Sequence, residues 1–72
     1  MDEGKRTLIE TTAIYLRPGD WWRGRGSGVL IHETELTDDG LLCVVGTIMT
    51  GRDRGFKGSW VLAFDTILEV ER

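Results

Sequence analysis

The segment VLIHETELTDDGLLCVVGTI, residues 29–48, predicts two β-strands joined by a tight turn. Its first half starts apolar and then alternates between apolar and polar residues, as a strand with one buried face does. TDDG, residues 37–40, is the turn, because aspartate tolerates turn geometry and glycine supplies a positive φ. LLCVVGTIMT, residues 41–50, is the most apolar run and the expected central strand. Gly46 within it indicates a bend, a bulge or a close backbone contact.

Alternation along the first of these strands assigns its side chains to two faces. One face carries Val29 and Ile31 with Glu33 and Glu35 beyond them, and the other carries Leu30, His32, Thr34 and Leu36. The strand is therefore expected to begin apolar and to end with charged side chains.

The segments on either side of this hairpin also have strand chemistry. RTLIETTAIYLR is rich in β-branched and aromatic residues, which favours a strand over 6–16 and leaves a helix there as the alternative. On the other side, SWVLAF puts three apolar side chains on one face, Trp60, Leu62 and Phe64, and Trp60 is expected in the core. ILEVER, residues 67–72, is the last strand candidate.

Seventy-two residues allow one domain, and we expect residues 6–72 to form it behind a flexible N-terminus of residues 1–5. Short strands separated by glycine and aspartate turns predict an all-β fold. The expected form is a small five-stranded SH3-like barrel, with an OB-like barrel as the alternative, because closing the sheet removes exposed strand edges. A chain of this size has a small core, so self-association stays open as a source of stability.

The composition argues against several function classes. Cys43 is the only cysteine and His32 the only histidine, so neither an intrachain disulfide nor a Cys/His zinc cluster is expected, and we expect no cofactor. Ser27 and Ser59 lie in glycine loops with a single histidine to activate either, so no catalytic residues are expected. The chain has neither a membrane-length apolar run nor a secretory signal, and its lone cysteine fits a reduced, cytoplasmic compartment.

Charge is unevenly distributed around a formal net charge of −3. Residues 17–28 hold three arginines against one aspartate, and residues 52–57 hold three basic residues against one aspartate, so each segment has a local charge of +2. Residues 29–51 hold four acidic residues and no lysine or arginine, a local charge of −4. Two basic, glycine-rich loops and one acidic hairpin are therefore expected, an asymmetry that bears on the choice of partner.

The pair Trp21-Trp22 stands at the start of the first basic loop. Adjacent residues of a strand point to opposite faces, so at most one of these indoles is expected to fill the core. The other is then available at an interface or against a loop.

TGRDRGFKGSWVL, residues 50–62, resembles the KOW motif of ribosomal proteins and transcription elongation factors. Ile48 precedes Gly51, basic residues surround Asp53, two further glycines follow at Gly55 and Gly58, and the closing apolar pair and acid are matched by Leu68, Val70 and Glu71. The resemblance covers residues 48–71 and departs from the pattern at Trp60 and Phe56. It implies an SH3-like barrel whose loops contact nucleic acid or a nucleoprotein.

DWWRGRGSG, residues 20–28, is similar to the paired-tryptophan strand of SH3 domains that bind proline-rich peptides. That resemblance implies that Trp21 lines a groove for a polyproline II ligand and that Trp22 is its structural neighbour. The proline and tyrosine that complete such a groove have no counterpart after this segment, since Pro18 and Tyr15 are the only ones in the chain.

The sequence thus predicts a non-catalytic interaction module of a transcription, translation or other nucleic-acid machine. Its candidate contact residues are Trp21, Trp22, Arg23, Arg25, Arg52, Arg54, Phe56 and Lys57. Arginine and lysine pair with phosphates, and aromatic faces stack on unpaired bases. The alternative is a protein-only binder, such as a phage or mobile-element accessory protein that docks on a host factor.

Overall fold

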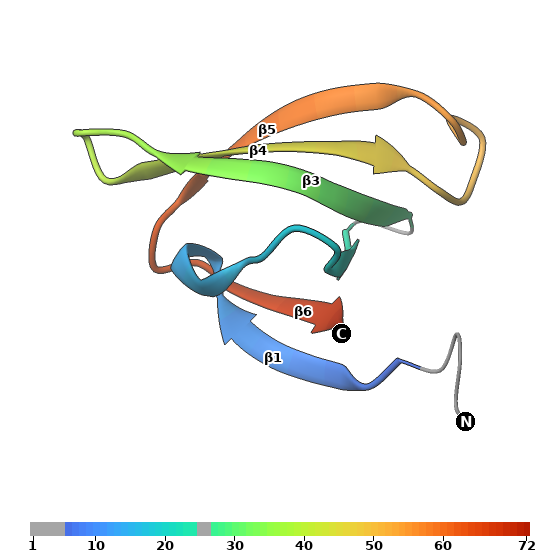
Figure 1. The fold of residues 1–72 in the computed structure, drawn as a ribbon, viewed down its shortest axis with the longest axis horizontal. Helices are drawn as coiled ribbons and strands as arrows, with labels where there is room; N and C mark the ends of the chain where they lie inside the picture. Colours follow the sequence, from blue (N-terminus) through green and yellow to red (C-terminus); the bar gives the residue numbers. More distant parts are fainter. Residues whose placement is uncertain (1–5, 25–26) are drawn as a thin grey trace.

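The computed structural model describes residues 6–24 and 27–72, and these residues form a six-stranded antiparallel sheet (Figure 1). Its elements are β1 (Leu8–Thr12), the 3-10 turn η1 (Ala13–Tyr15), β2 (Trp21–Arg23), β3 (Gly28–Leu36), β4 (Leu41–Ile48), β5 (Lys57–Ala63) and β6 (Ile67–Glu71). The predicted all-β class is confirmed. In this part of the chain no helix is long and apolar enough to cross a bilayer. The predicted flexible segment, residues 1–5, lies outside the described residues.

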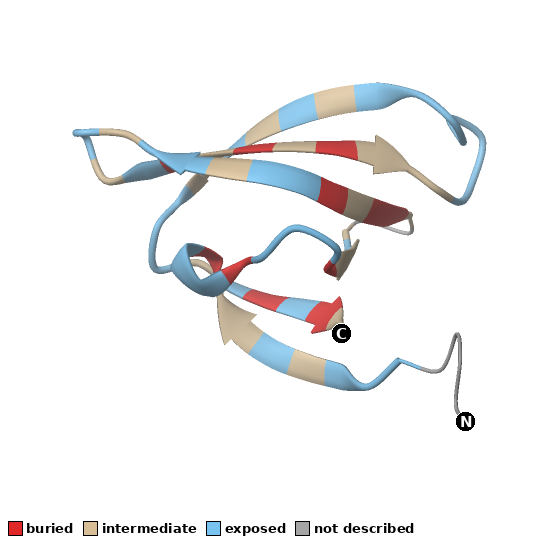
Figure 2. Ribbon diagram, in the orientation of Figure 1, coloured by how far each residue is buried: buried red, intermediate tan, exposed pale blue. Residues whose placement is uncertain are grey.

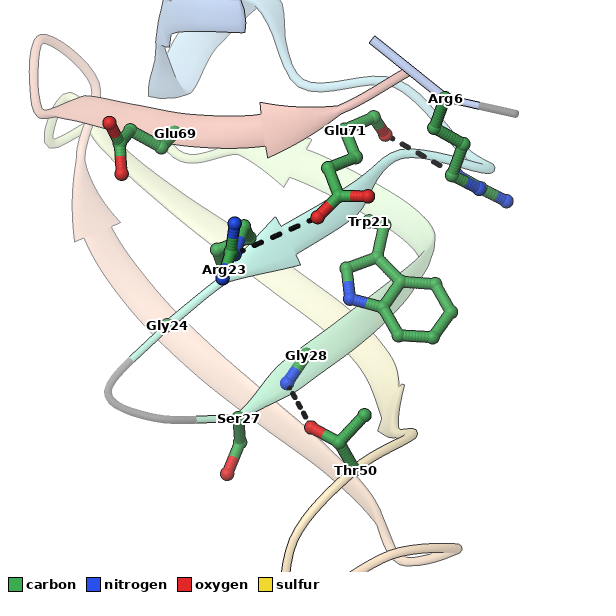
Figure 3. A pocket seen from close by; sticks show the side chains of 9 residues that line it. All are labelled: Arg6, Trp21, Arg23, Gly24, Ser27, Gly28, Thr50, Glu69 and Glu71. Atoms are coloured by element: carbon green, nitrogen blue, oxygen red, sulfur yellow. Dashed lines mark hydrogen bonds and ion pairs between the residues drawn. The ribbon is translucent and has the colours of Figure 1, made fainter. Parts of the chain in front are cut away.

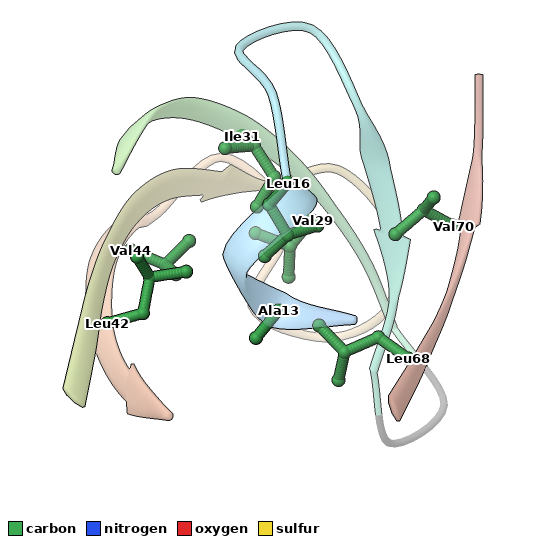
Figure 4. Packing of buried hydrophobic residues seen from close by; sticks show 8 residues of the cluster. All are labelled: Ala13, Leu16, Val29, Ile31, Leu42, Val44, Leu68 and Val70. Atoms are coloured by element: carbon green, nitrogen blue, oxygen red, sulfur yellow. The ribbon is translucent and has the colours of Figure 1, made fainter. Parts of the chain in front are cut away.

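The sheet curls around a single apolar core. Its strand order is β1-β6-β2-β3-β4-β5, so that β1 and β6 form one side and β3, β4 and β5 the other (Figure 1). Between the two sides lie Ala13, Leu16, Val29, Ile31, Leu42, Val44, Leu68 and Val70 (Figure 4). Figure 2 shows buried residues at alternate positions of β4 and β6, as expected for strands that bury one face.

The expected count of five strands was wrong, because Trp21–Arg23 forms a short strand of its own between β3 and β6. The two edges of the sheet are β1 and β5, and within the described residues no ladder joins them. A small β-domain is therefore established, as an open, curled sheet.

The first predicted strand ends earlier than residue 16. After Thr12 the chain makes a tight turn in which Leu16 N–H donates to the Ala13 carbonyl at 3.0 Å, and this buries both side chains. Ala13 N–H and Ile14 N–H donate to the carbonyls of Thr66 and Phe64, at 2.8 and 3.0 Å. Contacts with the β5–β6 turn thus satisfy the backbone groups that a continued strand would have paired, and they override the local strand propensity.

The central hairpin forms as predicted, with one change of register. Thr37 N–H donates to the Leu41 carbonyl at 2.7 Å, Gly40 has φ +78°, and β4 lies between β3 and β5. In β3, Ile31 lies opposite Gly46 and Glu33 opposite Val45, so His32 is an extra residue in a β-bulge.

The bulge corrects the expected assignment of faces beyond His32. Thr34 now lies opposite Val44 and Leu36 opposite Leu42, which puts them on the inner face that Val29 and Ile31 occupy. The backbone explains the need for glycine at position 46, since a Cβ there would lie 2.5 Å from the Leu30 carbonyl oxygen. The bulge and close contact that Gly46 indicated in the sequence are both present.

An ion pair between the buried Asp20 and the half-buried Arg72 fixes the turn that precedes β2. The Asp20 side chain is almost wholly buried and accepts hydrogen bonds from Arg72 Nε at 2.9 Å, Arg72 Nη2 at 2.8 Å and Arg17 N–H at 3.0 Å. Burial by itself raises the pKa of this carboxyl. The hydrogen bonds from Arg72 and Arg17, together with the positive charges of both residues, lower the pKa by more than burial raises it, so the net pKa lies below the usual value. The contact joins the end of β6 to the entry of β2.

We predict that Asp20→Asn lowers the free energy of unfolding at neutral pH by about 1–3 kcal/mol, because the buried charge-assisted hydrogen bonds are lost. A carboxyl whose folded pKa is depressed stabilises the fold fully above its unfolded pKa of about 3.9, and this contribution disappears as the pH falls through the folded pKa. Urea unfolding between pH 3 and 7, with exposed Asp38→Asn as control, should show the difference shrinking in acid. A pH-independent difference would contradict the role given to the charge.

Gly46→Ala should destabilise the domain by about 1–3 kcal/mol, because the new methyl group collides with strand backbone at the bulge. Gly24→Ala is the matched control, since the nearest atom to its added Cβ would be 3.8 Å away. Thermal unfolding of both variants measures the difference. Equal stability of the two variants would show that β3 moves away from β4 at no cost.

Candidate binding site

The three-residue strand β2 sends its two indoles to opposite faces of the sheet. Trp22 lies opposite Val29 and Val70, which belong to the core, and packs against that core. Trp21 lies opposite Leu30 and Glu71. Each indole borders a different pocket, and both pockets reach Gly24 and Ser27 on either side of the β2–β3 turn.

An apolar cleft opens on the inner face beside Trp22. The Trp22 and Trp60 rings meet edge to face, with centroids 5.8 Å apart and planes at 89°. The cleft has a volume of about 720 Å³ and is lined by Trp22, Arg23, Gly24, Ser27, Val29, Ile48, Trp60 and Leu62. Trp60 was expected in the core; it is half-buried and packs against the core while forming the cleft wall.

A second, more polar pocket of about 700 Å³ surrounds Trp21 on the outer face (Figure 3). The indole covers Gly28, where a Cβ would overlap the ring nitrogen, and the Arg6 guanidinium carbon lies 5.6 Å from the ring centroid. Arg23 Nε lies 3.7 Å from the Glu71 carboxylate on the same wall. Trp21 is the one aromatic residue that lines this pocket, so the aromatic partners of a polyproline groove are not among its lining residues.

The start of β3, where the first glycine-rich basic segment ends, lies beside the start of the second, the β4–β5 loop. Gly28 N–H donates to Thr50 Oγ1 and Met49 N–H donates to the Gly28 carbonyl, both at 2.7 Å. The β4–β5 loop therefore begins against the start of β3. Its four candidate contact residues are all exposed: Arg52, Arg54, Phe56 and Lys57.

The acidic hairpin lies at the other end of the molecule. Because β3 and β4 are antiparallel, the turn with Asp38 and Asp39 is at the opposite end of their ladder from the basic loops (Figure 1). Phe64 N–H donates to the Gly40 carbonyl at 3.1 Å, which brings the turn containing Asp65 to the same end. Along a longest dimension of 39 Å, the basic and acidic segments of the sequence are thus spatially separated.

The structure divides the predicted contact residues into three groups. Trp21 and Arg23 line the outer pocket, Trp22 lines the inner cleft, and the β4–β5 loop carries the exposed set given above. Arg23 also reaches the inner cleft, so it connects the two pockets. Arg25 lies outside the described residues.

Sequence reasoning missed three residues that shape these pockets. Ile48 and Trp60 form the far wall of the inner cleft, and Arg6 covers Trp21. The shared face of Trp60 and Leu62 was visible in the sequence, but no local signal indicated that Trp60 would meet Trp22. Arg6 precedes the first strand and reaches Trp21 only through the β1–β6–β2 arrangement.

Within 6–24 and 27–72 no three histidine, cysteine, aspartate or glutamate side chains gather as a metal site, and Cys43 is a free, half-buried thiol. Comparison with protein-family models, with curated proteins and with solved structures found no match to this chain.

The edge-to-face contact predicts an optical signature. Two indoles in contact at right angles couple their excited states and give paired far-UV circular dichroism bands of opposite sign. Trp22→Phe and Trp60→Phe should each abolish this pair of bands, whereas Trp21→Phe, on the other face, should leave it unchanged. Loss of the bands in Trp21→Phe would contradict the assignment of faces.

Proposed function

We propose that this protein is a non-catalytic binding module whose basic end contacts a short single-stranded segment of nucleic acid, free or within a nucleoprotein. The observation that carries the proposal is the exposed, basic β4–β5 loop beside a tryptophan-lined cleft.

Exposed cations gather on the β4–β5 loop. Arg52, Arg54 and Lys57 are exposed around one loop, and among the described residues none of them forms an ion pair. Arg23 is already paired with Glu71, so the β4–β5 loop supplies the more available positive charge. The acidic turns at the far end repel a long polyanion, which favours a short contact at the basic end over wrapping by a duplex.

Exposed aromatic surface occurs in the same loop as these cations. Phe56, in the same loop, is 66% exposed, and Ser27, which lines the Trp22–Trp60 cleft, lies beside Gly51 of that loop. Unpaired bases stack on exposed aromatic rings whatever the nucleotide sequence, because every base has a π-face. Basic side chains for the phosphates and aromatic rings for the bases thus occur together at this end.

The resemblance to KOW-type domains supports the same proposal, since it covers the β4–β5 loop. The curled sheet, with β1 and β6 facing β3–β5, is compatible with an SH3-like barrel that is open between β1 and β5. We infer a role within a transcription, translation or related nucleic-acid machine from that resemblance together with the contact chemistry.

Fluorescence anisotropy with labelled single-stranded RNA and DNA tests this function. If three cationic side chains contact phosphates, log affinity should fall with log salt at a slope of about −2. Arg52→Glu combined with Arg54→Glu should weaken binding at least about tenfold and flatten that slope. Arg17→Glu is a control of the same charge change per site, because Arg17, at the start of the 17–28 segment, is exposed and lines neither of the two tryptophan pockets.

No binding of either nucleic acid at low salt would contradict the proposal, as would equal losses in the loop and control variants. Thermal unfolding of each variant separates lost contacts from lost structure. This matters for Arg17→Glu in particular, since the positive charge of Arg17 helps to lower the pKa of the buried Asp20 carboxyl and the variant reverses that charge.

A second candidate function is protein-only binding, and the apolar lining of the inner cleft favours it. An apolar side chain of a partner would enter the cleft beside the Trp22–Trp60 pair, where burial of aromatic surface supplies affinity that depends little on salt. The anisotropy experiment distinguishes the two, because protein-only binding predicts no affinity for RNA or DNA at any salt concentration.

A further inference from the structure

The inner cleft and the outer pocket are nearly equal in volume but differ in charge. They measure about 720 and 700 Å³, each borders a tryptophan, and Arg23 lines both. Glu69 and Glu71 line the outer pocket (Figure 3), whereas among the residues that the structure describes no acidic side chain lines the inner cleft. An anionic ligand is therefore favoured in the inner cleft over the outer pocket.

Trp21, the aromatic ring of the outer pocket, is already covered by a cation of the chain itself. The Arg6 guanidinium carbon lies 5.6 Å from the ring centroid. Arg6 Nη1 donates to the Gly19 carbonyl at 3.0 Å and to the Glu71 carbonyl at 3.3 Å, which holds the guanidinium in place. A planar ligand that stacked on Trp21 would have to displace Arg6 and break these two hydrogen bonds.

Inside the inner cleft, the angle between Trp22 and Trp60 limits how many rings fit. Because the two indole planes meet at 89°, a planar ligand lies flat against one indole and meets the other with its edge. A stack held between the two indoles would need parallel planes. The volume of the cleft lies in the range of small-molecule sites. The geometry therefore fits a single planar ring system with its substituents.

The polar rim of the cleft leads to the β4–β5 loop. Arg23 and Ser27 supply the polar side chains among its described lining residues, and Ser27 Oγ would lie 3.2 Å from a Cβ on Gly51 of that loop. The Arg23 side chain is 57% exposed and lies 3.7 Å from Glu71, a surface ion pair of a kind that contributes little stability. Exchanging Glu71 for a phosphate therefore costs Arg23 little.

We propose that one unstacked base of the bound strand enters the inner cleft, while the phosphates beside that base contact Arg23 and the cations of the β4–β5 loop. This inference rests on the function proposed above, because the loop cations hold the strand. A nucleobase joins two flat faces to a polar edge and an anionic backbone, which matches an aromatic cleft with a basic rim. An aliphatic side chain of a protein partner would match the lining and leave the basic rim without a counterpart.

Strands with and without bases test this pocket by fluorescence anisotropy. One labelled strand consists of abasic units throughout, and a second of the same length carries a single base at its centre. We expect the single base to raise the affinity at least about fivefold, because stacking of one base on aromatic side chains contributes this much or more. The abasic strand should still bind through its phosphates, with an affinity that falls as the salt concentration rises.

Two tryptophan variants locate the base. Trp60→Leu should reduce the gain from the single base to less than about twofold. Trp21→Leu, in the pocket of similar volume, should keep the whole gain. The gain is a ratio of two affinities of the same variant, measured at a temperature where thermal unfolding shows the variant to be folded, so a general loss of affinity cancels.

Indole N–H signals in NMR spectra give an independent check. Trp21→Phe and Trp60→Phe assign two of the three signals, and the third belongs to Trp22. The single-base strand, compared with the abasic strand, should shift the signals of Trp22 and Trp60 and leave that of Trp21 unchanged.

Equal affinity of the two strands would overturn the base pocket and leave the proposed function standing, since the phosphate contacts are measured separately. Binding that needs more than one base would overturn it too, as would a gain that persists in Trp60→Leu, because the base then stacks elsewhere. Failure of every strand, the ordinary one included, to bind at low salt would overturn the proposed function together with this inference. An apolar peptide that shifts the Trp22 and Trp60 signals where the base does not would assign the cleft to protein-only binding.

Discussion

The fold depends on β2, three residues that join the two halves of the sheet. On one side it pairs with β3, and on the other Trp21 and Trp22 lie opposite Glu71 and Val70 of β6. Without these pairs the strands β1 and β6 would form one sheet and the strands β3, β4 and β5 another. The Asp20–Arg72 ion pair supports the junction from just outside the strand. The same three residues also distribute the indoles to the two pockets, so the site and the fold depend on one short ladder.

The local sequence pattern was sufficient to predict the central hairpin. It did not predict the backbone conformation where contacts with a distant segment determine it. Residues 29–48 carry their own alternation and turn chemistry, and they fold as expected apart from the bulge at His32. That bulge follows from the close approach of Gly46 to the opposite strand. The end of β1 at Thr12 follows from hydrogen bonds to the β5–β6 turn. Neither cause lies within a few residues of its effect.

The same distinction between local and distant causes applies to the candidate site. Exposed loop charges such as Arg52 and Arg54 could be identified from composition alone, since glycine-rich basic loops stay at the surface. The alternation of Trp21 and Trp22 was also predictable from strand geometry. The contact between Trp22 and Trp60 was not, because it joins strands far apart in the sequence through the curl of the sheet. Charge position was thus easier to predict than pocket shape.

The position of β6 between β1 and β2 has a consequence for how the chain folds during synthesis. β3, β4 and β5 are neighbours in sequence and can pair as soon as they leave the ribosome, whereas β1 emerges first and must wait for residues 67–71. Closing so long a loop is slow compared with forming a hairpin. The nascent polypeptide therefore exposes β1 throughout elongation, and its amino-terminal strand is among the last to find a neighbour.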